Sequence, residues 1–90
     1  MGYDENFRKV LLGEPHVILG KKGISVEFTN HLMKLLKRHK IIKVKALKSV
    51  ADKSNINKIA NQITGATNSY LLDLRGFTFI ISKNQIKKKL

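Results

Sequence analysis

His16-Val17-Ile18-Leu19-Gly20-Lys21-Lys22-Gly23-Ile24-Ser25 is the stretch that sets the plan of this chain. The apolar run before Gly20 has the length of a short buried strand, and Ser25 is a favourable N-cap for the amphipathic helix that follows. Two glycines allow the backbone to turn tightly between the two elements. Lys21 and Lys22 form the tip of that turn, next to the positive end of the helix dipole. Such a turn fits a phosphodiester backbone, and it also fits a plain connection between a strand and a helix.

Outside this stretch, segments whose apolar residues have the spacing of a helix alternate with segments that have the composition and spacing of a strand. Asp52 or Ser54 can cap a third helix, and Gly65 is expected to end it as a C′ glycine. Two apolar runs meet at Gly76, which predicts a tight hairpin. The expected helices cover 4–12, 25–38 and the segment ending at 65, and the expected strands cover 16–19, 41–47, 70–75 and 77–82.

This order predicts an α/β fold: a compact α-β-α-β-α-β-β domain with a four-stranded mixed sheet. Ninety residues are enough for one domain with a modest core. We expect a single domain over 1–90, with its core at about 16–83 and a basic tail at 84–90. Neither an internal repeat nor a linker divides the chain.

The chain is strongly basic. Eighteen Lys and Arg against six Asp and Glu give a net charge of +12, and the isoelectric point is near 10.3. A charge of this size predicts an anionic partner, with nucleic acid favoured over a membrane surface. Cysteine is absent, which excludes disulfides and thiolate metal sites. No stretch has the length of a membrane span, and the polar start is unlike a signal peptide, so we expect a cytoplasmic protein that binds no membrane.

Several basic side chains are candidates for contacts with nucleic acid. The tip lysines are the strongest, because a turn bounded by glycines is a poor place for core residues. A second group lies on the helix after the turn, although cations near a helix C-terminus are also favoured by its dipole. A third group lies on strands. The candidate nucleic-acid-binding residues are Gly20, Lys21, Lys22 and Gly23 in the turn, His31, Lys34, Lys37 and Arg38 on the helix, and Lys43, Lys45 and Arg75 on the strands.

Catalysis is not indicated. The three histidines do not have a metal-ligand spacing, and Asp52 and Asp73 are too isolated to form a catalytic pair. Neither a nucleophile with its base nor a phosphate-binding nucleotide loop is found. Tyr70, Phe77 and Phe79 could stack on bases, but their apolar surroundings favour core packing. We therefore expect a protein that is not an enzyme and needs no cofactor and no metal.

Four segments, in order, resemble the CRM domain family (chloroplast RNA splicing and ribosome maturation), and the chain is most similar to its YhbY-like single-domain members. The likeness runs from about residue 16 to 83. It rests on the GxxG turn with its hydroxyl cap, on a strand that bears lysines, on a Thr-Gly-Ala at a helix end, and on the closing hairpin. These segments are 20–25, 39–45, 64–66 and 74–81.

The resemblance implies a fold similar to the C-terminal domain of translation initiation factor three. It also implies RNA binding through the GxxG loop, with ribosome assembly or precursor rRNA as the setting. Two alternatives remain open. The Alba family of DNA-binding chromatin proteins has a similar βαβαββ plan and a Gly-Lys-Lys after its first strand, but it carries a long basic hairpin arm. A ribosome-associated subunit that mainly contacts protein would instead show an exposed apolar patch on its sheet.

Overall fold

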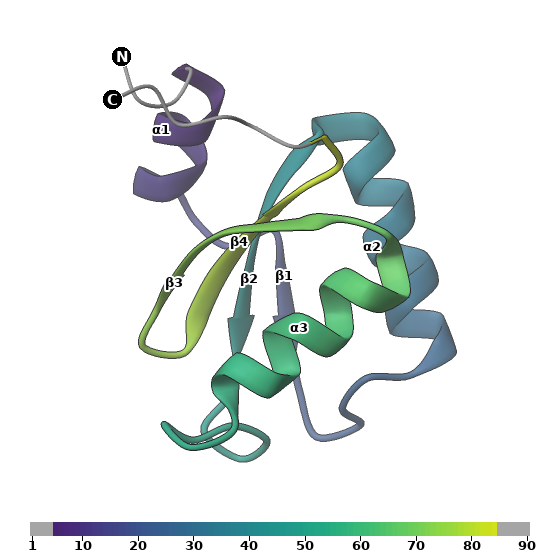
Figure 1. The fold of residues 1–90 in the computed structure, drawn as a ribbon, viewed down its shortest axis with the longest axis vertical. Coiled ribbons are helices and arrows are strands. Elements are labelled where there is room, and N and C mark those ends of the chain that lie inside the picture. The colour runs from purple at the N-terminus through teal and green to yellow at the C-terminus, as the bar shows by residue number, and fades with distance from the viewer. Residues whose placement is uncertain (1–4, 85–90) are drawn as a thin grey trace.

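The computed structural model describes residues 5–84, and its helices and strands follow the expected order (Figure 1). The basic tail expected over 84–90 lies outside the described residues except for its first position. The elements are α1 (Glu5–Leu12), β1 (Val17–Leu19), α2 (Val26–His39), β2 (Ile41–Ala46), α3 (Ile56–Thr67), β3 (Tyr70–Arg75) and β4 (Thr78–Ser82).

The four strands form one mixed sheet in the order β1-β2-β4-β3. β1 pairs with β2 in parallel, with Val17 opposite Val44, and the other two pairings are antiparallel. A parallel pair needs a crossover connection, and α2 provides it. The predicted α/β fold with a four-stranded mixed sheet is therefore confirmed.

Helices lie on both faces of the sheet. α2 and α3 cover one face, which we call the α2/α3 face, and most of the hydrophobic core lies beneath them. α1 lies on the opposite face, the α1 face, where Phe7 and Val10 pack against Ile41 and Ile80. The buried residues under α2 and α3 are Leu19, Leu32, Leu36, Ile42, Val44, Ala46, Ala51, Ile56, Ala60, Ile63, Phe79 and Ile81.

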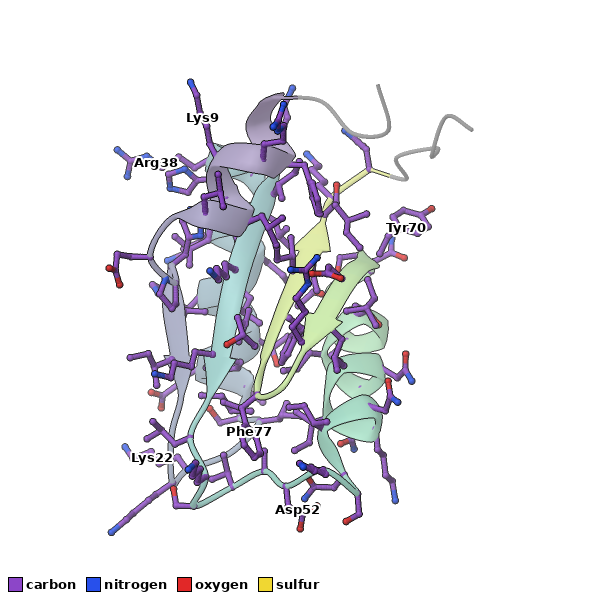
Figure 2. All side chains as sticks on the ribbon, turned by 90° about the vertical axis from the view of Figure 1, so that its left-hand side faces the viewer. Lys9, Lys22, Arg38, Asp52, Tyr70 and Phe77 are labelled. Carbon is purple, nitrogen blue, oxygen red and sulfur yellow. The ribbon has the colours of Figure 1, made fainter. Side chains whose placement is uncertain are left out.

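α1 covers only one end of its face, as Figure 2 shows. The other end of the α1 face is open, and Ile18 there is 55% exposed. The expectation that 16–19 would form a buried strand was therefore wrong for Ile18. Its neighbours Val17 and Leu19 point to the opposite face and pack on the core, as the two-residue period of a strand requires.

Helix α3 ends later than expected. The prediction that Gly65 ends it was wrong, because the helix runs on to Thr67 and Asn68 takes the left-handed conformation instead, with φ 53° and ψ 50°. Asparagine tolerates this conformation better than most residues do. The extra turn buries Thr67, whose hydroxyl donates to the carbonyl of Ile63 at 2.7 Å.

Asp52 organises the segment that leads into α3. Its carboxylate accepts hydrogen bonds from the backbone N–H groups of Ser54 and Asn55, at 2.8 and 3.0 Å, and from the hydroxyl of Ser54. In return, Asn55 Oδ1 accepts from the N–H of Asp52 at 2.7 Å. These bonds, led by that of the Ser54 hydroxyl, lower the pKa of Asp52. The N-cap of α3 is Asn55, which makes no side-chain capping bond, so the prediction that Asp52 or Ser54 caps this helix was wrong. Asp52 instead closes the turn that precedes Ile56, the first helical residue.

The hairpin between β3 and β4 has a two-residue loop. Arg75 pairs with Thr78, so Phe77 belongs to the turn and not to the strand expected over 77–82. Gly76 adopts a φ of +56°, which residues with a side chain rarely take. The loop is as short as the sequence predicted.

β3 contains a bulge. The pairing with β4 shifts between Leu71 and Asp73, which leaves Leu72 as an extra residue. Because of this extra residue, Leu71 and Leu74 both pack on the main core although three positions separate them. Leu72 packs instead against the cluster under α1.

Candidate nucleic-acid interface

The GKKG segment forms a tight turn between β1 and α2. The N–H of Gly23 donates to the carbonyl of Gly20 at 2.9 Å, and Gly23 has a φ of +67°. A residue with a side chain would be strained at that angle. Lys21 and Lys22 are the two central residues of the turn, and both are exposed. The turn therefore presents two ammonium groups to solvent, while the N–H of Gly23 is used inside it.

Ser25 caps α2 as predicted. Its hydroxyl accepts from the N–H of Phe28 at 3.1 Å, and its carbonyl accepts from that of Thr29 at 2.9 Å. Glu27 adds a negative charge to the first helical turn. The side chain of Ser25 already uses the N–H of Phe28. An anion that approaches the start of α2 would therefore meet the lysines of the GKKG turn more readily than the N–H groups of the helix end.

The predicted basic side of α2 is exposed along its length. Leu32 and Leu36 point to the core, and the basic residues lie on the solvent side of the helix. A helix rises about 1.5 Å per residue, so the axial distance from the start of α2 to Arg38 is about 18 Å. Figure 2 accordingly shows Lys22 and Arg38 at opposite ends of the molecule. The exposed basic residues of this side are His31, Lys34, Lys37 and Arg38.

Lys43 has a different environment from the other candidates. Its ammonium group donates to the carbonyls of Leu11 and Gly13, at 3.0 and 2.9 Å. These carbonyls lie at the C-terminal end of α1, where a helix carries partial negative charge and unpaired acceptors. Lys43 therefore fastens α1 to the sheet, and its charge is directed at the protein.

Lys45 and Arg75 lie on the same face of the sheet as Lys43. Lys45 is exposed next to Ile18 in the strand pairing. The side chain of Arg75 is 74% exposed and forms an ion pair with Asp73, with 3.1 Å between Nε and Oδ2. The structure thus divides the candidates into those of the GKKG turn and α2 and those on the α1 face of the sheet. The first group contains Gly20, Lys21, Lys22, Gly23, His31, Lys34, Lys37 and Arg38, and the second contains Lys43, Lys45 and Arg75.

The three aromatic candidates differ in exposure. Phe79 is fully buried, and Phe77 is partly buried against the main core. Tyr70, at the start of β3, is 45% exposed. Core packing therefore holds for the two phenylalanines, whereas the ring of Tyr70 is accessible from outside.

Two histidines that are distant in the sequence meet in the fold. The ring centroids of His16 and His39 are 5.0 Å apart. His16 Nδ1 accepts from the backbone N–H of Lys43 at 3.0 Å. The backbone N–H of His16 in turn donates to the carbonyl of Lys43 at 2.9 Å. Partial burial, followed by the charge of His39, lowers the pKa of His16. The sequence spacing gave no sign of this pair, because tertiary packing brings it together.

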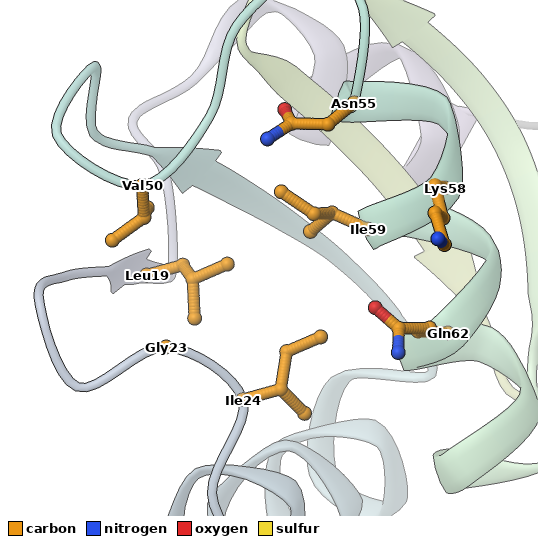
Figure 3. A pocket seen from close by; sticks show the side chains of 8 residues that line it. All are labelled: Leu19, Gly23, Ile24, Val50, Asn55, Lys58, Ile59 and Gln62. Atoms are coloured by element: carbon orange, nitrogen blue, oxygen red, sulfur yellow. The ribbon is translucent and has the colours of Figure 1, made fainter.

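A hollow lies between the GKKG turn and α3 (Figure 3). Its volume is about 460 Å³. Two of its polar residues, Lys58 and Gln62, were not among the predicted site residues. Their spacing of four residues beside the apolar stripe of α3 was the signal in the sequence. The residues that line the hollow are Leu19, Gly23, Ile24, Val50, Asn55, Lys58, Ile59 and Gln62.

Within residues 5–84, no group of three or more His, Cys, Asp or Glu side chains is placed to hold a metal ion. In the same part of the chain, none of the helices is both long and apolar enough to cross a bilayer.

A family model described as the CRS1/YhbY (CRM) domain matches residues 8–83, which is most of the chain. This chain belongs to the CRM domain family. A search of the curated proteins gave no match. Among solved structures, the CRM domain described here is similar to a hypothetical protein, SAV1595 from Staphylococcus aureus, which was described as a candidate RNA-binding protein. The TM-score is 0.73 at 20% identity, and the match covers 92% of this chain and 84% of the other. At 20% identity, this similarity supports the fold alone.

Proposed function

We propose that this CRM domain is a non-catalytic RNA-binding protein that captures the RNA backbone with its GKKG turn. The main observation is the exposed pair Lys21 and Lys22, held by a glycine-bounded turn at one end of the basic side of α2. Contacts of this kind neutralise phosphates and position a strand without reading its sequence. RNA shape or a neighbouring protein then supplies the specificity.

The proposed setting is ribosome assembly in the cytoplasm, on precursor rRNA or on an assembling subunit. Membership of the CRM family supports this setting, because the family resemblance implies it. The RNA binding suggested for the structurally similar staphylococcal protein is consistent with it. The net charge of +12 supplies the attraction that an rRNA partner requires.

The test compares two double variants that each remove two positive charges. Lys21→Ala with Lys22→Ala should weaken RNA binding by roughly 1–3 kcal/mol and flatten the dependence of log K on log salt by about one to two units. Lys87→Ala with Lys88→Ala, in the segment beyond the described residues, should weaken it much less. The measurements are RNA affinity at several salt concentrations and melting temperature. Equal losses in both variants would show that net charge, and not the turn, carries the binding.

One observation favours a second candidate function, a contact with protein. On the α1 side of the sheet, Leu12 and Ile18 are 82% and 55% exposed. Apolar side chains exposed on one face of a domain can form part of an interaction surface. Ile18→Ser should then abolish co-sedimentation with ribosomal subunits while affinity for free RNA is unchanged. Unchanged co-sedimentation would remove this candidate.

A further inference from the structure

The hollow beside the GKKG turn has the composition of a small ligand site. Leu19, Ile24, Val50 and Ile59 supply apolar walls, from both sides of the hollow. Its volume of about 460 Å³ falls in the range of about 300–1,000 Å³ that is usual for ligand pockets. Such pockets combine apolar walls with a few directed polar groups, and this one has three polar side chains on its α3 side.

The amide of Asn55 has a fixed orientation. Its Oδ1 accepts from the N–H of Asp52 at 2.7 Å, and an N–H can donate only to the oxygen of the amide. The other amide atom, Nδ2, is therefore directed away from that bond, and Figure 3 shows the nitrogen facing the hollow. The site thus contains a positioned hydrogen-bond donor.

Lys58 and Gln62 extend the polar rim along α3. They are four residues apart, so they lie on one side of the helix. Figure 3 shows both beside the hollow, with Ile24 opposite Gln62. None of the described residues that line the hollow is acidic. With Lys21 and Lys22 in the adjoining turn, the surroundings favour a ligand that is flat and apolar on its faces and carries negative charge at one end.

We propose that this hollow binds one unpaired base of RNA whose phosphate lies on the GKKG turn. The aliphatic side chains contact the faces of the base. Asn55 Nδ2 donates to a carbonyl oxygen or ring nitrogen on its edge, and Gln62 pairs with a second edge atom. A base stacked in a duplex cannot enter the hollow, so the site selects single strands. The proposal rests on the phosphate contact of the turn and adds a contact with the base.

The first experiment separates bases from phosphates. The probes are an eight-nucleotide RNA, the same strand with every base removed, and the intact strand in a duplex. Removing a contact that buries roughly 60 Å² of apolar surface should weaken binding about tenfold. We therefore expect the abasic strand to bind about tenfold more weakly than the intact one, and the duplex to bind like the abasic strand. Equal affinity for the intact and abasic strands overturns the proposal.

The second experiment uses neighbouring positions of α3. Gln62→Ala should weaken binding of the intact strand about threefold to tenfold, the loss of one hydrogen bond, and leave the abasic strand unaffected. Asn61→Ala, an exposed residue outside the hollow, is the matched control and should change neither value. Melting temperatures confirm that both variants fold. An intact-strand affinity that Gln62→Ala leaves unchanged overturns the proposal.

The outcome for the turn is read separately. Lys21→Ala with Lys22→Ala should weaken the intact and abasic strands equally, because it removes phosphate contacts and no base contact. If the turn variant loses affinity while intact and abasic strands bind alike, the base site is wrong and the phosphate clamp stands. If the turn variant loses no affinity, the proposed function of the turn is wrong, whatever the bases contribute.

Discussion

Lys43 and Lys45 are two residues apart on one strand and share one face of the sheet, yet their charges are used differently. Lys43 donates to two carbonyls at the end of α1, whereas Lys45 is exposed. The sequence predicted their common face, because a strand has a period of two. It could not predict which lysine meets the helix, since Leu11 and Lys43 are 32 positions apart.

Replacing Lys43 tests this difference. Lys43→Met keeps the aliphatic stem and removes the ammonium, so two carbonyls lose their charged donor. We expect the free energy of unfolding to fall by about 1–2 kcal/mol, with RNA affinity within about twofold of wild type. Lys45→Met is the control and should leave stability nearly unchanged. Urea denaturation and RNA binding measure the two effects. A stable Lys43→Met protein with lost RNA affinity would show that Lys43 contacts RNA.

His16 predicts how stability depends on pH. Its pKa is lowered in the fold, so near and below the unfolded value of about 6.5 the unfolded chain binds more protons than the native one. Above a pH of about 6.5, neutral His16 costs the fold no stability. As the pH falls below this value, the free energy of unfolding decreases. Protonation of Nδ1 would also remove the acceptor for the N–H of Lys43. Melting temperature should therefore fall between pH 7 and 5.

The control for this pH dependence is His16→Asn, in which an amide oxygen takes the place of the ring nitrogen and does not titrate in this range. Its melting temperature should change less with pH between 7 and 5. A pH profile identical to that of wild type would mean that His16 is not the group responsible.

At the scale of elements, the sequence predicted the centres of helices and strands better than their ends. Helix α3 illustrates the reason. Both Gly65 and Asn68 can end a helix, and the burial of Thr67 under the last turn decides between them. The cap of α2 was predictable, because Ser25 acts on a residue only three positions away.

Gly65 within a helix gives a direct prediction. A Cβ added there would meet nothing within 4 Å, and the residue is helical. Gly65→Ala should therefore stabilise the protein by about 0.5–1 kcal/mol, because alanine loses less backbone entropy. Gly76→Ala should destabilise it, since the φ of +56° disfavours a side chain. Thermal melting of both variants checks this pair, and a destabilised Gly65→Ala would favour an end of the helix at Gly65.

At the scale of the whole molecule, the alternation of segments with helical and strand spacing predicted the order of the elements and the mixed sheet. The sequence did not show that α1 covers one end of the opposite face, that His16 approaches His39, or that Lys58 and Gln62 face the GKKG turn. Each of these depends on how elements pack. The exposure of the candidate residues was predicted best where they are close in sequence, in the turn and along α2.

The net charge of +12 and the GKKG turn together predict which nucleic acid is bound and how binding depends on salt. If about five phosphates are neutralised, log K should fall with log salt with a slope of about −4. RNA should bind at least as well as duplex DNA of equal length. Competition binding at two salt concentrations measures both. A clear preference for duplex DNA would contradict the RNA proposal and favour the Alba-like alternative.

The bulge in β3 also affects how copies of the protein meet. Both outer strands of an open sheet present unpaired backbone groups, on which another chain can add as a strand and start aggregation. Here β1 is only three residues long. β3 is interrupted at Leu72 and carries the charged pair Asp73 and Arg75 near its end. Neither edge offers a long regular template, so copies of the protein at high concentration can lie side by side without joining their sheets into a fibre.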